Sequence, residues 1–166
     1  MSDRHEVSHM IVRVARAHQL AATCLLRPLG LYLGQELLLM RLWERDDQSQ
    51  ADLAKALSLD PSTVTRTVRS LEQQGLLTRR PSERDRRALV VSLTDEGRAL
   101  RDQVEHAWSE LERAALAGMP DRQRAETLRV LRRLEGNLTA ALPEIRAACP
   151  PGVPGDPGDP GDPHHP

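Results

Sequence analysis

The sequence has few of the residues that build disulfide, metal or membrane-spanning structures. Its 166 residues include two cysteines, Cys24 and Cys149, which lie far apart and outside any Cys-x-x-Cys spacing. A disulfide framework or a cysteine-based zinc site is therefore not expected. The sequence also lacks an apolar run of about 18 residues for a membrane span, and its N-terminus lacks the apolar segment of a signal peptide. We expect a cytoplasmic protein with no membrane partner.

Motifs of enzymes and cofactor sites are also missing. The chain has no glycine-rich phosphate loop, no nucleophile motif and no complete set of metal ligands. His5 and His9 lie four residues apart and could share one helical face as a zinc pair, but two ligands do not close a site. We predict that the protein is not an enzyme and that it holds no metal and no cofactor.

Charge is distributed unevenly along a chain whose net charge is only −1. Residues 62–87 carry seven arginines against three acidic residues, a local net charge of +4. Such a local basic stretch is typical of nucleic-acid contact. By contrast, residues 150–166 are rich in proline, glycine and aspartate and carry no basic residue. This composition predicts a disordered tail.

Periodicity and capping residues predict a mainly α-helical fold with a small β wing. Apolar residues recur every three to four positions in the helical segments, and alternation takes over after Gly75. Ser49, Asp60 and Thr94 are suited to cap the helices that follow them. The predicted order is α-α-α-α-β-β-α-α, a winged helix-turn-helix. Its predicted helices lie near 5–27, 33–45, 49–57, 61–74, 94–118 and 122–142, and the last is expected to end at Pro143. Its predicted strands lie near 77–79 and 89–93.

Three regions follow from this reading. Residues 33–97 form the predicted DNA-binding domain, and residues 150–166 form the tail. Residues 5–30 and 98–145 carry more apolar surface than one small module can cover, which predicts a helical dimerisation region. Two-fold symmetry would then place two DNA half-sites about 34 Å apart.

The helix at 61–74 has two distinct faces. Val64, Val68 and Leu71 cluster on one side, and the opposite side is polar without large apolar side chains. Arginine can donate two bonds to guanine and glutamine can pair with adenine, while small hydroxyls let a helix N-terminus approach phosphates. The alternative is an ordinary solvated face. The candidate DNA-binding residues here are Ser62, Thr63, Thr65, Arg66, Arg69 and Gln73, joined by Ser49 and Gln50 on the preceding helix.

The loop between the two predicted strands carries the second candidate contact. Arg84, Arg86 and Arg87 surround Asp85 at its tip. Arginines at such a tip could enter a minor groove, where the negative potential attracts them. Asp85 would repel phosphate, so we interpret it as the residue that orients a wing arginine. The alternative is a charged turn that promotes solubility.

Four segments resemble the multiple-antibiotic-resistance regulator (MarR) family. They are Ser49-Gln-Ala-Asp-Leu-Ala54, Ser62-Thr-Val-Thr-Arg66, Leu71-Glu-Gln-Gln-Gly-Leu-Leu77, and Asp85-Arg-Arg87 leading to Val91-Ser-Leu-Thr-Asp-Glu-Gly97. The resemblance covers about residues 5–145. It implies an obligate homodimer joined through the first and last helices. It also implies that residues 62–73 read the major groove of a pseudo-palindrome and that Arg87, held by Asp85, enters the minor groove.

The resemblance predicts a ligand-responsive repressor that binds double-stranded DNA sequence-specifically as a homodimer. Many relatives respond to small aromatic effectors, for which Arg13, Arg16 and His18 on the first helix are the polar candidates. One alternative is a winged-helix module that binds proteins, and another is a metal- or thiol-responsive regulator of the same fold. The peroxide-sensing branch places its cysteine near the start of the first helix with tyrosine partners. Cys24 lies near the end of that helix, so we expect it to be a small core residue.

Overall fold

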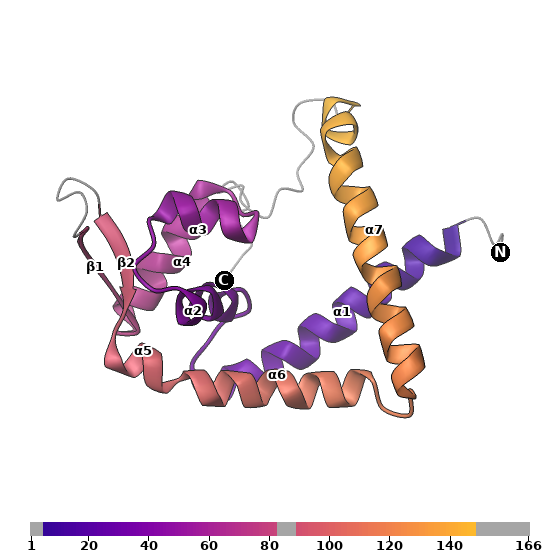
Figure 1. Cartoon of the computed structure of the whole chain (residues 1–166), viewed down its shortest axis with the longest axis horizontal. Helices are drawn as coiled ribbons and strands as arrows, with labels where there is room; N and C mark the ends of the chain where they lie inside the picture. The colour runs from indigo at the N-terminus through magenta and orange to yellow at the C-terminus, as the bar shows by residue number, and fades with distance from the viewer. Residues whose placement is uncertain (1–4, 83–88, 149–166) are drawn as a thin grey trace, which may run out of the picture. The chain divides into compact units, whose positions relative to one another are not determined.

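The computed structural model describes residues 5–82 and 89–148, and it confirms the predicted mainly helical fold with a two-stranded wing (Figure 1). Two compact units divide the described residues, one ending at Ala115 and the other beginning at Leu116, and each is described by itself. The elements are α1 Glu6–Leu26, the 3₁₀ turn η2 Arg27–Leu29, α2 Gln35–Glu44, α3 Gln50–Leu57, α4 Pro61–Gln73, β1 Leu77–Pro81, β2 Leu89–Leu93, α5 Asp95–Ala99, α6 Arg101–Ala115 and α7 Asp121–Ala148.

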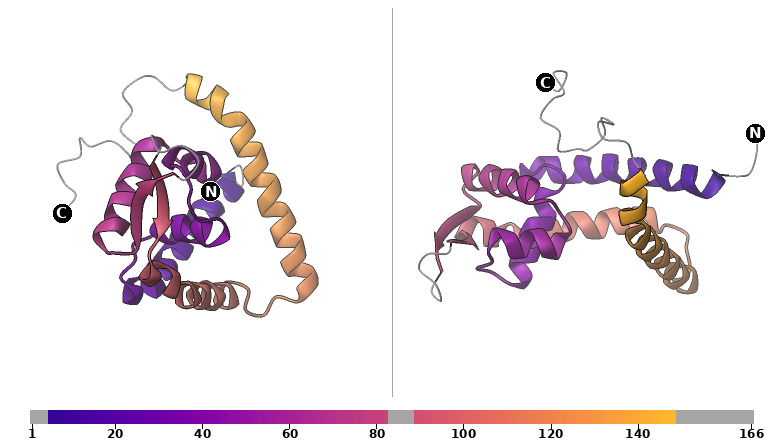
Figure 2. Two further views of the ribbon diagram at one scale, coloured as in Figure 1. Left: turned by 60° about the vertical axis from the view of Figure 1, so that its left-hand side comes forward. Right: turned by 90° about the horizontal axis from the view of Figure 1, so that it is seen from above.

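The core of the first unit lies around α2. Leu38, Leu39 and Leu42 of this helix are almost completely buried. Leucine and valine side chains of α3, α4, both strands and α6 pack around them. Each fully buried side chain of this kind contributes about 1.5–3 kcal/mol. On the other side of the unit, α1 packs against α6 (Figure 2).

The wing is an antiparallel pair whose register runs from Leu77 opposite Leu93 to Pro81 opposite Leu89. Gln48, in the loop between α2 and α3, pairs with Val91 through two backbone hydrogen bonds of 3.2 and 2.8 Å. The loop before the helix-turn-helix is thus attached to the wing, although the sequence showed no third strand there.

One predicted helix, from Thr94 to Gly118, is in fact two. Thr94 caps its start as expected, because its hydroxyl accepts the Gly97 N–H at 3.0 Å. α5 then ends at Ala99, and α6 begins at Arg101. The indole Nε1 of Trp43 donates to the Gly97 carbonyl oxygen at 3.0 Å. A side-chain donor entering the helical ladder interrupts it, and periodicity alone could not show a donor from α2.

The predicted end of the last helix at Pro143 is also wrong, since α7 continues to Ala148 with Pro143 inside it. Proline removes one backbone hydrogen bond, to the carbonyl four residues earlier. Here that carbonyl belongs to Thr139, and both residues are exposed. Water can therefore hydrate the carbonyl, which lowers the cost of the lost bond. Packing is a weak constraint as well, because no residue of α7 is buried within its unit.

Glu36 is a buried acid that the apolar pattern of α2 did not reveal. Its side chain is 1% exposed, and its Oε2 accepts the Gly34 N–H at 2.7 Å. Burial raises the pKa of the Glu36 carboxyl, although backbone hydrogen bonds oppose the shift. The folded state therefore holds a proton on Glu36 at pH values where the unfolded chain has released it.

Replacing this acid should stabilise the protein. As the pH rises from the usual glutamate pKa towards the raised one, the native protein binds more protons than the unfolded chain, so the free energy of unfolding falls. Glu36→Gln keeps an acceptor for Gly34 but cannot ionise. We expect the variant to be more stable than wild type at neutral pH and to lose this pH dependence. Urea unfolding at a series of pH values measures both effects.

The matched control is Glu112→Gln, at an exposed position of α6. It should leave stability nearly unchanged, as is usual for surface substitutions. A Glu36→Gln protein that is less stable than wild type at neutral pH would contradict the cost assigned to the buried carboxyl.

Candidate nucleic-acid interface

Two short helices and a tight turn form the helix-turn-helix. Ser49 caps α3, its hydroxyl accepting the Asp52 N–H at 3.1 Å. The chain reverses at Ser58, whose φ is +53°. Asp60 then caps α4 by accepting the Thr63 N–H at 2.9 Å, with Pro61 in the first turn. The caps predicted at Ser49 and Asp60 are both confirmed.

The two faces predicted for α4 are present. Val64, Val68 and Leu71 are completely buried and hold the helix against the core. The opposite face is open to solvent. On it Ser62, Thr65, Arg66, Arg69 and Gln73 are exposed. Thr63 is half-buried, as are Ser49, which caps α3, and Gln50 in the first turn of α3.

The arginines near α4 differ in their partners. Arg79 of β1 donates from Nε and an Nη to the Glu72 carboxylate, and Arg80 pairs with Asp47. Within residues 5–82 and 89–148, neither Arg66 nor Arg69 has a hydrogen-bond or ion-pair partner. Two of the seven arginines counted in the sequence, Arg79 and Arg80, are thus paired with acids of the chain, and the exposed face of α4 keeps two guanidinium groups for an external anion or base.

The hydroxyls of the same face have partners inside the protein. Ser62 and Thr63 both donate to the carboxylate of Asp60, and Thr65 donates to Oε1 of Gln50 at 2.9 Å. The side-chain hydrogen bonds from Ser62 and Thr63 hold the pKa of Asp60 well below its usual value. In this structure the three hydroxyl groups therefore donate to acceptors of the chain.

Two acids that sequence reasoning missed hold the base of the wing. Asp47, with φ +59°, accepts the Ser92 hydroxyl of β2 at 2.6 Å and pairs with Arg80 of β1. Asp46 accepts the Leu93 N–H at 3.0 Å. An Asp-Asp pair after a helix looks like any polar loop, so no local signal could have found it. The predicted contacts at the wing tip, Arg84, Asp85, Arg86 and Arg87, lie outside the described residues.

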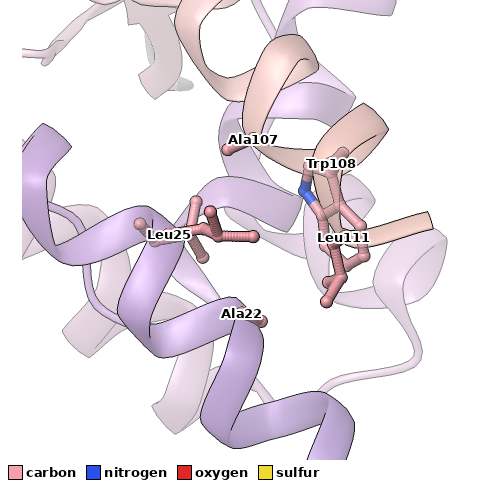
Figure 3. A pocket seen from close by; sticks show the side chains of 6 residues that line it. Ala22, Leu25, Ala107, Trp108 and Leu111 are labelled. Atoms are coloured by element: carbon pink, nitrogen blue, oxygen red, sulfur yellow. The ribbon is translucent and has the colours of Figure 1, made fainter. Parts of the chain in front are cut away.

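The predicted effector candidates lie on the exposed surface of α1. Arg13, Arg16 and His18 are exposed, and the His18 ring lies 5.7 Å from that of Trp108. A small apolar pocket does lie between α1 and α6, with the Trp108 indole on one wall (Figure 3). Its lining consists of Ala22, Leu25, Leu26, Ala107, Trp108 and Leu111.

Cys24 is exposed, so its prediction as a core residue is wrong. Ala22 and Leu26 of α1 are buried. Cys24 lies two positions from each of them and therefore points to the opposite side of the helix. In the described part of the chain, His5 and His9 do not gather with a third metal-ligating residue. Among the described helices, none is long and apolar enough to cross a membrane.

The fold and this face define a winged helix-turn-helix protein, and comparison with known proteins agrees. Residues 31–89 match the model of the MarR family. The organic hydroperoxide resistance transcriptional regulator of Bacillus subtilis (strain 168) is 38% identical over 80 residues, which cover 48% of this chain and 54% of that protein. The alignment thus spans about half the length of this relative.

Solved structures extend the likeness to most of the described chain. A MarR transcriptional regulator from Methanosarcina mazei Go1 superposes with a TM-score of 0.71 and 29% identity, over 81% of this chain and 96% of that one. The structure of reduced AbfR bound to DNA superposes with a TM-score of 0.69 and 26% sequence identity, over 83% of this chain and 93% of that one. The chain is thus similar to MarR-family regulators in sequence over residues 31–89 and in fold over most of its length.

Proposed function

We infer that this protein is a sequence-specific DNA-binding transcription regulator. The exposed polar face of α4 carries the inference. Among the described residues, Arg66 and Arg69 on this face have no partner, and the opposite face of the helix is buried in the core. A helix of this kind suits a major groove, in which arginine reads guanine. The structural neighbour AbfR, solved on DNA, supports the same use of the fold.

The regulator acts as a homodimer in this proposal. Within the first unit, α1 exposes a row of apolar side chains, and α7 taken by itself exposes another. Contiguous exposed apolar surface of this kind marks a site of association. The exposed residues are Val7, Met10, Ile11 and Val14 on α1 and Leu128, Leu131, Leu138, Leu142 and Ile145 on α7. Two copies related by a two-fold axis would read a pseudo-palindromic operator.

The finer proposal is a repressor released by a small aromatic effector, as the family resemblance implies. Arg13, Arg16 and His18 remain the candidate contacts, and their exposure on α1 leaves them accessible to a ligand. The wing contact of Arg87, oriented by Asp85, likewise remains part of the proposal.

Selection of bound duplexes from a random pool tests the regulator. We expect enrichment of a pseudo-palindrome whose half-sites lie about one helical turn apart. Affinity should fall steeply with salt, because arginine–phosphate contacts release counterions. Sedimentation should give twice the chain mass of 18.5 kDa. A pool without enrichment would exclude sequence-specific binding, and a monomer would exclude the dimer.

A further inference from the structure

The hydroxyl groups at the DNA-facing edge of the helix-turn-helix share one property. Each of the four has its single proton committed to an acceptor of this chain. Ser49 donates to Asp52 at 2.7 Å, and Thr65 has Gln50 at 2.9 Å and the Pro61 carbonyl at 2.8 Å within reach. Ser62 and Thr63 donate to the two carboxylate oxygens of Asp60. Since a hydroxyl carries one proton and two lone pairs, only its lone pairs remain for an external partner.

Asp60 stabilises these hydrogen bonds at the start of α4. Its carboxylate also accepts the Thr63 N–H, so three donors converge on it. Hydrogen bonds to an ionised acceptor are about twice as strong as neutral ones. Asp60 is ionised at neutral pH as an aspartate ordinarily is, and the hydrogen bonds from Ser62 and Thr63 lower its pKa further. An exposed carboxylate at this position would also repel a phosphate, which disfavours a backbone contact at the first turn.

Resting on the DNA binding proposed above, we propose that Ser62 and Thr63 read bases as hydrogen-bond acceptors, and that Asp60 is the positioning residue that sets this mode. The only base donors in the major groove are the amino groups of cytosine N4 and adenine N6. Phosphate oxygens, guanine O6 and N7 and thymine O4 are all acceptors, and a hydroxyl without an available proton cannot bond them.

The arrangement of α4 indicates where such a base lies. Ser62 and Arg66 are four residues apart and therefore share one face, one turn from each other. Arg66, which has no partner among the described residues, retains its donors for guanine O6 and N7. The two side chains thus present opposite hydrogen-bonding character to neighbouring positions of the groove. The amino group whose removal weakens binding should therefore lie at or beside the base pair whose guanine contacts Arg66.

Removing single amino groups from the DNA tests the proposal. In the duplex selected from the random pool, each cytosine is replaced by 2-pyrimidinone and each adenine by unsubstituted purine, which lack only the exocyclic amino group. We expect one position in each half-site at which the replacement weakens binding by the full-length protein about three- to tenfold. In Ser62→Ala or Thr63→Ala, the same replacement should cause no further loss.

The opposite outcomes are equally clear. If the losses from the variants and from the base replacements multiply at every position, the hydroxyls do not contact an amino group. If Ser62→Ala and Thr63→Ala weaken all duplexes equally, these hydroxyls contact phosphate. Either result overturns the inference while leaving DNA recognition intact. A protein that selects no sequence would instead refute the proposed function.

Asp60→Asn tests the positioning role. Asparagine still caps the helix but offers one acceptor oxygen where aspartate has two, so at least one hydroxyl proton is freed. We expect reduced discrimination between the amino and amino-free bases, with little change in thermal unfolding. The matched control is Asp121→Asn, an exposed acid that begins α7. Unchanged base discrimination in Asp60→Asn would show that Asp60 only caps the helix.

Discussion

Arg66→Ala should weaken binding to the selected duplex about 5- to 150-fold, or about 1–3 kcal/mol, and relax the sequence preference at one base position. The reason is that the Arg66 guanidinium is available to an external acceptor. Among the described residues, Arg66 has no carboxylate partner, so no acceptor there satisfies its donors. In a groove they can form two parallel bonds to one guanine.

Competition binding against duplexes with each base changed in turn measures the effect. The control is Arg113→Ala, which removes an equal charge from an exposed ion pair on α6. This control should keep both affinity and sequence preference. If Arg66→Ala instead weakens binding equally on every duplex and lowers the salt dependence, Arg66 contacts phosphate and does not read a base.

Gly97→Ala should destabilise the fold by about 3 kcal/mol, near the upper end of the usual cost of overpacking. A Cβ on Gly97 would overlap the carbonyl oxygen of Leu76, which is backbone and cannot turn aside. The same carbonyl accepts the Thr94 N–H at 3.1 Å, and the Gly97 carbonyl accepts the Trp43 indole at 3.0 Å. Moving the two segments apart would therefore strain the junction of the wing, α5 and α2.

Gly136→Ala is the matched control, because a Cβ there meets nothing within 4 Å. Alanine favours a helix over glycine by about 1 kcal/mol, so this variant should be slightly more stable than wild type. Urea unfolding followed by circular dichroism measures both. Equal unfolding midpoints for Gly97→Ala and wild type would show that the backbone relaxes around the added methyl group.

Much of the helix-turn-helix could be predicted from local patterns. The caps at Ser49, Asp60 and Thr94 and the buried face of α4 all depend on residues within about four positions of each other. Such neighbours are fixed by helical geometry once the helix forms. The exposure of Arg66 and Arg69 on that helix followed for the same reason.

Errors arose where distant segments meet or where packing is absent. The break before α6 depends on Trp43, 54 positions from Gly97. The continuation of α7 past Pro143 depends on its exposure, since solvent replaces the lost bond. Cys24 is exposed because α1 packs through only one face. None of these outcomes has a signal within the segment itself.

The sequence by itself determined that this chain has a polar reading helix with a buried apolar back, followed by a wing. Only the tertiary structure decided which polar groups of that surface remain available. Arg80 is paired with an aspartate 33 positions away, whereas Arg66 and Arg69 keep their donors among the described residues. The Thr65 hydroxyl donates to Gln50 of α3, 15 positions away, whereas Ser62 and Thr63 donate to Asp60 within the same turn, which is a local contact. Hydrogen bonding is directional and saturable, so a group's chemistry depends on the partner that folding brings to it.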